Sequence, residues 1–230
     1  MVPVFAIFFP LEMAILLTAI VHFLNNGFKF LLLGKHANWP IIVRFGIPAV
    51  IFAYLGAELL KRMEHLPEIM HYTINEHIFA VTWIKVIIGL LLIIFAIIEI
   101  IPSASSWQAD RKYLPLGGIL SGFFGGLSGH QGALRSIFLL RSGLTKEGYI
   151  ATGVVIACFV DIARMSNYIP ELIRSKTELN YPLLITATLT AFTGAFLGNK
   201  LLKKMTIRSL QIIVSVMLMF FGLVLVVGFI

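Results

Sequence analysis

Long apolar runs separated by short polar stretches dominate the chain. Seven apolar segments lie at roughly 3–33, 41–61, 79–101, 115–141, 148–168, 182–202 and 208–229. Each is close to or above the ~20 residues that a helix needs to cross the hydrocarbon core of a bilayer. The connections between them are too short to hold a soluble domain. The pattern predicts an all-α polytopic protein with the lipid bilayer around it.

Composition supports this fold class and narrows the partners. Of the 230 residues, 59% are hydrophobic and 13% are charged. The formal net charge of +7 does not indicate a nucleic-acid partner, because the basic residues lie in short loops at segment ends, where they set membrane orientation. The single cysteine, Cys158, excludes an internal disulfide and a cysteine-based metal cluster. We therefore predict neither a metal nor a cofactor.

The fourth segment contains a glycine-rich stretch from Gly117 to Arg135. Its seven glycines make an uninterrupted helix unfavourable, at a cost of roughly 1 kcal/mol each against alanine. A broken backbone is tolerated in lipid only where protein buries it or where it lines a wet cavity. One interpretation is that the glycines let helices pack closely. The polar residues at the break favour a substrate site instead, made of Ser128, Gly129, His130, Gln131, Gly132 and Arg135.

A second set of polar residues lies in the first segment. His22, Asn25, Asn26 and Lys29 are spaced by three and four, so they share one face of a helix. Ionisable groups inside a span usually face a cavity or a partner. Lys29 could alternatively extend from the end of the segment to the membrane surface.

The chain is an internal duplication. Residues 49–63 match residues 191–205 with a shift of 142, and eight of these fifteen positions are identical. A shift of 135 pairs Asn26 with Asp161 and Lys29 with Arg164. Asp161 and Arg164 could serve the site or simply neutralise each other. We predict two tandem transmembrane repeats, at 1–101 with three spans and at 115–230 with four. The first repeat would then lack its opening glycine-rich helix.

Basic residues predict an orientation if all seven segments cross the membrane. The loops after the second, fourth and sixth segments would then share the cytoplasmic side, the two repeats would run parallel, and the glycine-rich segment would cross. Eight basic residues flank these loops and five flank the others; the eight are Lys61, Arg62, Arg141, Lys146, Lys200, Lys203, Lys204 and Arg208.

Three motifs resemble the TauE/SafE family of bacterial membrane proteins, the sulfite and organosulfonate exporters. They are SGFFGGLSGHQG at 121–132, the segment endings Leu-Leu-basic-basic, and LTAIVHFLNN at 17–26 followed by GKHANW at 34–39. The resemblance covers essentially the whole chain. It implies a multi-pass protein of the bacterial inner membrane, built from two four-span repeats, that exports small sulfur-containing anions.

These observations favour a secondary or passive transporter rather than an enzyme. The chain has no G-x-x-x-x-G-K-[ST] loop, so direct use of ATP is not expected. Arg135, one turn past the break, is the predicted principal anion contact, and His22, His130 or Asp161 could carry a coupled proton. An intramembrane enzyme that uses these His and Asp residues, or a scaffold subunit, are the alternatives. The missing helix could be supplied by residues upstream of Met1, which we favour, or its place could be covered by a second subunit in a homodimer. The predicted substrate-binding residues are Asn25, Asn26, Lys29, Ser128, Gly129, His130, Gln131, Gly132, Arg135 and Arg164.

Overall fold

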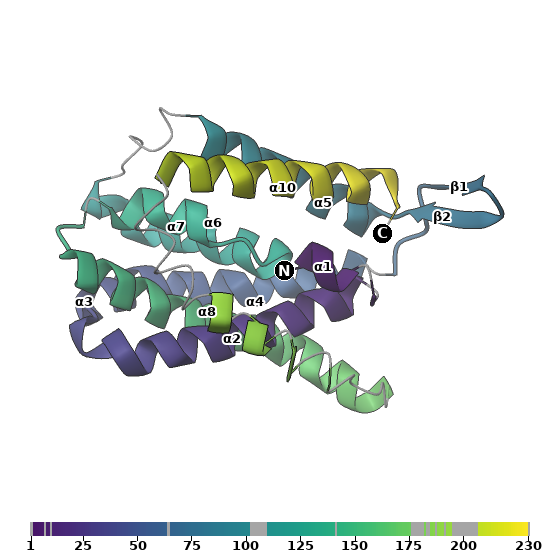
Figure 1. Ribbon diagram of the computed structural model, residues 1–230. Coiled ribbons are helices and arrows are strands. Elements are labelled where there is room, and N and C mark those ends of the chain that lie inside the picture. Colours follow the sequence, from purple (N-terminus) through teal and green to yellow (C-terminus); the bar gives the residue numbers. More distant parts are fainter. Residues whose placement is uncertain are drawn as a thin grey trace.

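The computed structural model describes residues 2–229 except 7, 10, 64, 102–109, 141, 176–181, 183–184, 187, 191 and 195–206. Most of the described chain is helical (Figure 1). The helices are α1 (Val2–Ala6), α2 (Leu11–Leu33), α3 (Trp39–Ile41), α4 (Ile47–Met63), α5 (Trp83–Ile100), α6 (Leu114–Ser128), α7 (Gly132–Leu139), α8 (Lys146–Ser175) and α10 (Ile207–Val227). Three short turns join them, namely η1 (Gly34–His36), the π-helical η2 (Ile42–Gly46) and η4 (Arg111–Tyr113).

Four of the described helical stretches have the length and hydropathy of membrane spans. They are Met13–Leu31, Trp39–Met63, Trp83–Ile100 and Lys146–Pro170, and the apolar part of α10, Ile212–Val227, is shorter. The first, second, third and fifth predicted segments therefore correspond to spans, and the chain is a multi-pass membrane protein. The sixth predicted segment, with the second copy of the repeat at 191–205, lies largely outside the described residues.

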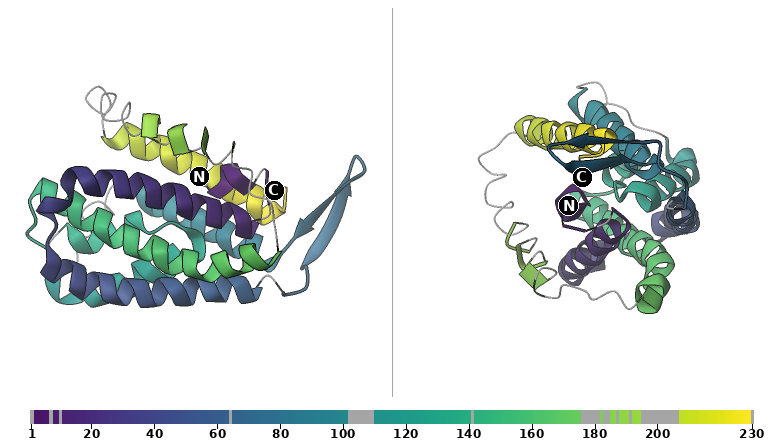
Figure 2. Two further views of the ribbon diagram at one scale, coloured as in Figure 1. Left: turned by 90° about the horizontal axis from the view of Figure 1, so that it is seen from below. Right: turned by 90° about the vertical axis from the view of Figure 1, so that its right-hand side faces the viewer.

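The helices form a group of four with a pair along one side. The group contains α2, α4, α8 and the short α6–α7 unit, and α5 lies along α10 (Figures 1 and 2). The closest helix pairs are α4 with α6, α5 with α10, and α2 with α8. Each pair joins a helix from the first predicted repeat to one from the second. The two halves of the chain are therefore interlocked.

Glycines set the close approach of α6 to α4. Gly118, Gly122 and Gly126 are spaced by four and share one face of α6. A Cβ atom on any of them would overlap a backbone carbonyl oxygen of the facing segment, and these oxygens belong to Phe45, Ala49 and Ala53, respectively. The packing interpretation is thus correct for these three glycines. Small residues allow this approach between helices in lipid.

The glycine-rich segment does not cross the bundle as one helix. The helix stops at Ser128 and restarts at Gly132, and α7 then runs back along α6 (Figure 1). A Cβ on Gly117 would overlap the ring of Phe138, and the Ser121 hydroxyl donates to the Gln131 carbonyl at 3.0 Å. The start of α6 and the end of α7 therefore lie at the same end of the bundle. The prediction that this segment crosses is wrong.

This reversal changes the predicted orientation. We call the end with α3, η4 and the first turn of α8 the α3 end, and the opposite end, with the β-hairpin, the hairpin end. The Asn38 amide donates to Thr152 Oγ1 at 2.9 Å, so the loop after α2 packs on the start of α8. Lys146 therefore lies at the α3 end, whereas Lys61 and Arg62 lie at the end of α4 near the hairpin. The prediction that these basic residues lie on one side of the membrane is therefore wrong. Helices α2 and α8 are equivalent in the sequence repeat, and they run antiparallel. The prediction that the two repeats run parallel is therefore wrong as well.

A β-hairpin projects from the bundle between α4 and α5 (Figure 2). Strands β1 (Met70–Ile74) and β2 (His77–Val81) are antiparallel, and the turn residues Asn75 and Glu76 have φ of 47° and 66°, as a type I′ turn requires. The Tyr72 hydroxyl donates to the Val227 carbonyl at 2.8 Å and anchors the hairpin to α10. The hydropathy pattern does not predict this hairpin. The third predicted segment therefore begins in a strand, and its helix starts only at Trp83.

Candidate anion site at the break between α6 and α7

The break is a turn that only glycine adopts easily. Gly129 has φ of 77°, in the left-handed region, and its amide donates to the Gly125 carbonyl at 2.9 Å to close α6. The buried Ser128 hydroxyl donates to the Phe124 carbonyl at 2.8 Å and accepts from the His130 amide at 3.3 Å. His130 Nδ1 lies 3.1 Å from the Ser128 carbonyl, a contact that requires the proton on Nδ1. The turn is therefore held by its own side chains.

Beyond the turn, α7 directs its N-terminus at the break. The first amides of a helix have no partner within that helix, and its dipole favours an anion there. Gly132, the first residue of α7, has no atom within 4 Å of a Cβ built on it, so this approach is open. Arg135 donates from Nη1 to Gln131 Oε1 at 3.4 Å. The helix start is thus accessible and has a cation one turn away.

Helix α8 places a buried ion pair beside the turn. Arg164 donates from Nε at 3.1 Å and from Nη2 at 2.8 Å to Asp161 Oδ1, and the two side chains are 1% and 0% exposed. A Cβ built on Gly129 would lie 2.8 Å from Arg164 Nη1. The guanidinium therefore fits against the turn because residue 129 has no side chain.

The third guanidinium nitrogen has no hydrogen-bond partner. Arg164 Nη1 is buried and unpaired among the residues that the structure describes, and the same holds for Thr18 Oγ1 and Asn25 Oδ1 on α2. An unsatisfied polar group in an apolar surrounding costs several kcal/mol. These atoms therefore need a partner that the described residues do not supply, such as water or a ligand. For a cationic donor such as Nη1, an anion is the strongest partner.

Helix α2 completes the surroundings of the ion pair. Asn26 donates from Nδ2 to Asp161 Oδ2 at 3.3 Å, so both carboxylate oxygens of Asp161 are used. His22, one turn from Asn26, lies within electrostatic range of Arg164 and His130. Lys29, one turn in the other direction, is half-buried and lies in the field of Arg135. The polar face that the sequence predicted for α2 therefore faces the break.

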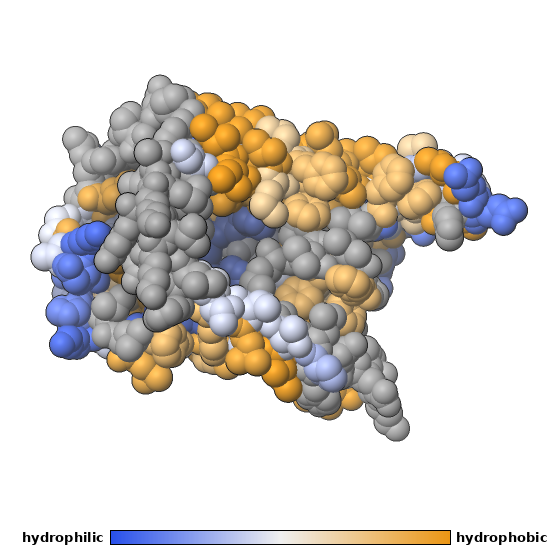
Figure 3. Space-filling view, in the orientation of Figure 1, coloured by the Kyte–Doolittle hydropathy of each residue, from blue (hydrophilic) through white to orange (hydrophobic). Residues whose placement is uncertain are grey.

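The structure sorts the predicted residues into three groups. Ser128, Gly129, His130 and Arg164 meet at the turn, with Asn26 joined to them through Asp161. Gln131, Arg135 and Lys29 form a second group, with Gly132 next to Gln131 at the start of α7. Asn25 has a buried oxygen with no partner in the described part of the chain. Figure 3 shows a recessed hydrophilic patch between α10 and α2, on a surface that is otherwise largely apolar.

Two residues of this region were not predicted. Ser121 is 1% exposed and ties α7 to α6 through the Gln131 carbonyl. Thr18 is 2% exposed and precedes His22 by one turn on the polar face of α2. The spacing of Thr18 from His22 was a usable signal, since four residues separate neighbours on a helix face. Ser121 had no such signal, because its partner depends on the reversal of the chain.

The fold and the site define a class of protein: a polytopic helical membrane protein with a buried cation at a helix break. The chain belongs to the TauE/SafE sulfite exporter family, whose family model matches residues 1–225. The protein is thus a member of a membrane transporter family. No curated protein and no solved structure matches it significantly. Within the described part of the chain, no cluster of three or more His, Cys, Asp or Glu side chains is placed to hold a metal ion.

Proposed function

We propose that the protein carries small sulfur oxyanions, such as sulfite or an organosulfonate, across the membrane and binds them at the break between α6 and α7. The observation that carries this proposal is Arg164 Nη1, a buried cationic donor that has no partner among the described residues and lies against Gly129, in the turn that leads into α7. An oxyanion there accepts from Nη1 and from the first amides of α7. Both interactions are stronger in a site without bulk water than at a surface.

Arg164 is the anchor in this proposal, and Arg135 has a secondary role. The sequence favoured Arg135 because it lies one turn past the break. In the structure its Nη1 faces Gln131, and its Nε lies near α8, 3.5 Å from a Cβ built on Gly153. Arg164 instead presents a free nitrogen to the turn itself. Arg135 and Lys29 then draw the anion toward the turn from the α3 end.

Inverted repeats would provide the transport movement. Asn26 and Asp161 are 135 positions apart, the shift of the sequence repeat, and they are hydrogen-bonded to each other. Equivalent residues meet in this way at a pseudo-twofold axis. The antiparallel course of the equivalent helices α2 and α8 places that axis in the membrane plane, as in transporters with inverted topology. Binding near the axis allows access to alternate between the two sides.

Asp161 would stay bound to Arg164 while the substrate is present. It neutralises Arg164 through two hydrogen bonds, and an arriving anion takes the third nitrogen without displacing it. Transport is then driven by the anion gradient or by a proton carried on Asp161, His22 or His130. ATP has no part in the proposal.

Flux into proteoliposomes tests the proposal. Purified protein should move labelled sulfite down its gradient without changing it chemically. The double variant Asp161→Asn/Arg164→Gln removes both charges and leaves no buried charge unpaired, so it should fold and lose the flux. Gly27→Ala is the matched control, because a Cβ on Gly27 meets no atom within 4 Å. Conversion of sulfite to another species, or equal flux from the double variant, would contradict the proposal.

A further inference from the structure

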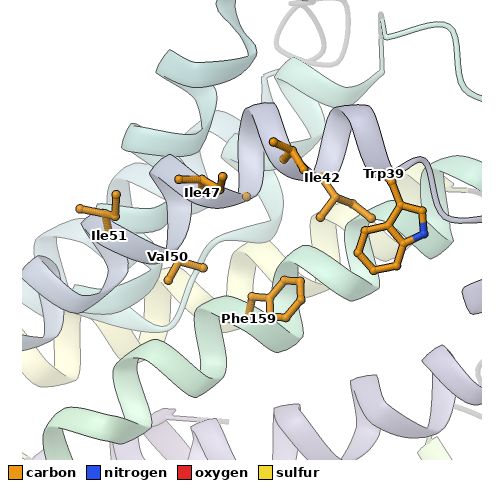
Figure 4. A pocket seen from close by; sticks show the side chains of 8 residues that line it. Trp39, Ile42, Ile47, Val50, Ile51 and Phe159 are labelled. Carbon is orange, nitrogen blue, oxygen red and sulfur yellow. The ribbon is translucent and has the colours of Figure 1, made fainter.

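A second site lies on the outer face of the bundle, away from the break. It is an apolar groove of about 320 Å³ between the η2–α4 segment and α8 (Figure 4). All eight residues that line it are apolar, from Trp39 at one end to Ile51 at the other, with Phe159 contributed by α8. The groove belongs to two membrane spans, Trp39–Met63 and Lys146–Pro170.

Gly46 is a buried lining residue of the groove, and there is room for a Cβ at this position. A Cβ on Gly46 would meet only Ile42 Cγ2 at 3.6 Å and Ile156 Cγ1 at 3.7 Å, which are ordinary contacts. This differs from Gly122, where a Cβ would overlap a carbonyl oxygen. Gly46 is also the last residue of η2, and π-helical turns occur frequently at functional sites. Close helix packing therefore does not account for this glycine.

The dimensions of the groove favour an acyl chain. From Trp39 to Ile51 a helix rises about 18 Å, slightly more than half of the ~30 Å hydrocarbon core. A lipid chain from one leaflet covers that depth, whereas a helix from a second copy would run the full thickness. Trp39, 58% exposed at the start of its span, is the type of residue that marks the membrane surface. The exposed side chains of Val43, Ile47 and Ile51 continue the surface that contacts lipid.

The exposed cation Arg44, next to the groove in sequence, favours an anionic lipid headgroup. Arg44 lies in η2 between the lining residues Val43 and Gly46, and its side chain is exposed. Within the described ranges it forms no ion pair. A long basic side chain this close to the start of a span extends toward the lipid phosphates. Lys35 is exposed nearby, at the same end of the bundle.

We propose that the groove binds one acyl chain of an anionic phospholipid, whose phosphate contacts Arg44. This site is independent of the anion site at the break. It fixes a structural lipid between α4 and α8, the two helices that pack on α6 and α2.

Lipid-dependent stability in detergent tests the proposal. Thermal unfolding is followed as phosphatidylglycerol or phosphatidylcholine with identical chains is added. Phosphatidylglycerol should stabilise the protein at lower concentration. Arg44→Gln should weaken its apparent affinity roughly fivefold, to the level of phosphatidylcholine. Lys112→Gln removes a cation at the same end but outside the groove, and should leave the preference unchanged.

A groove-filling variant separates a bound chain from a charge effect. A Cβ on Gly46 meets only the side chains of Ile42 and Ile156, at ordinary contact distances, so Gly46→Leu adds bulk at the groove without a clash at Cβ. It should abolish stabilisation by both lipids while the protein stays folded. Inorganic phosphate alone should not stabilise the wild type. Equal lipid stabilisation of Gly46→Leu and the wild type would overturn the proposal. So would a dimer that Gly46→Leu dissociates, because the groove would then hold a second copy.

Discussion

Helices α2 and α8 occupy equivalent places in the sequence repeat, yet their polar residues form different contacts. On α8, Asp161 and Arg164 form a fully buried ion pair. On α2, the equivalent residues are Asn26 and Lys29, and Asn26 bonds across to Asp161 instead of to its own neighbour. Lys29 is half-buried and has no ion pair in the described part of the structure.

This difference between α2 and α8 suggests two separate roles, which two identical residue pairs would share. The α8 pair is fixed by three hydrogen bonds and holds one guanidinium nitrogen against the turn at Gly129. In the proposed function, the α2 cation would attract an anion and release it. One half of the site would then set geometry, and the other would supply mobile charge.

The largest expected effect comes from breaking the pair on α8. Arg164→Ala leaves the Asp161 carboxylate buried without its cation, and should lower the free energy of unfolding by about 3–5 kcal/mol. Lys29→Ala, the equivalent change on α2, should cost under about 1 kcal/mol, because no ion pair is lost. Unfolding in detergent measures both. Equal losses would show that the two helices do not differ in this way.

Asn26 links the two halves, and its removal should rank second. Asn26→Ala deprives Asp161 Oδ2 of its donor, and a hydrogen bond to a charged group contributes about 1.5–3 kcal/mol. Arg164 remains paired through Oδ1, so the protein should fold. The double-mutant cycle with Asp161→Asn should show coupling between residues 26 and 161. Additive losses would mean that the 3.3 Å contact contributes nothing.

Close packing around the break is expected to contribute less. Gly122→Ala forces α6 away from the Ala49 carbonyl, and overpacking of this kind costs about 1–3 kcal/mol. Gly27→Ala on α2 should be neutral or stabilising by up to about 1 kcal/mol, because alanine favours a helix and open space surrounds this site. Melting temperatures of the two variants give the comparison. A Gly122→Ala variant as stable as the wild type would show that the close packing of α6 on α4 does not contribute to stability.

The smallest effect on stability is expected for Lys29→Met, which should change the free energy of unfolding by no more than about 0.5 kcal/mol. Its effect should appear in transport, as a several-fold rise in the sulfite concentration that gives half-maximal flux. Lys35→Met, at the exposed α3 end, is the control for general surface charge. If both variants shift the flux equally, Lys29 acts only through surface potential.

Hydropathy was sufficient to predict four of the spans but not the path of the chain. An apolar run such as 115–141 has the length of one crossing, and the same length is filled by α6 and α7 folded back on each other. The contact of Gly117 with Phe138 decides between them, and no local pattern encodes it. The hairpin was missed for a different reason. The aromatic and β-branched residues at 70–81 continue into an apolar helix, so hydropathy merges them with it.

The sequence predicted which segments carry the polar residues better than how these residues contact one another. The polar face of α2 and the polar break were both visible as spacing in the sequence, because helix periodicity and glycine content are local properties. The role of Arg164 was not visible in the sequence. The sequence offered a mutual ion pair with Asp161 or a site residue, and in the structure two nitrogens bind Asp161 while the third faces the turn. That division depends on how α8 packs against Gly129, which is a tertiary property.

The most direct measurement is sulfite binding by titration calorimetry to the wild type and to Asp161→Asn/Arg164→Gln. Asp161→Asn keeps the size of the side chain and Arg164→Gln leaves a shorter neutral one, so both charges are removed, and folding is checked by unfolding. The wild type should bind sulfite, and the folded double variant should show no detectable binding, because the guanidinium nitrogen at Gly129 is gone. Binding of equal affinity by the two proteins would contradict an anion site at Arg164.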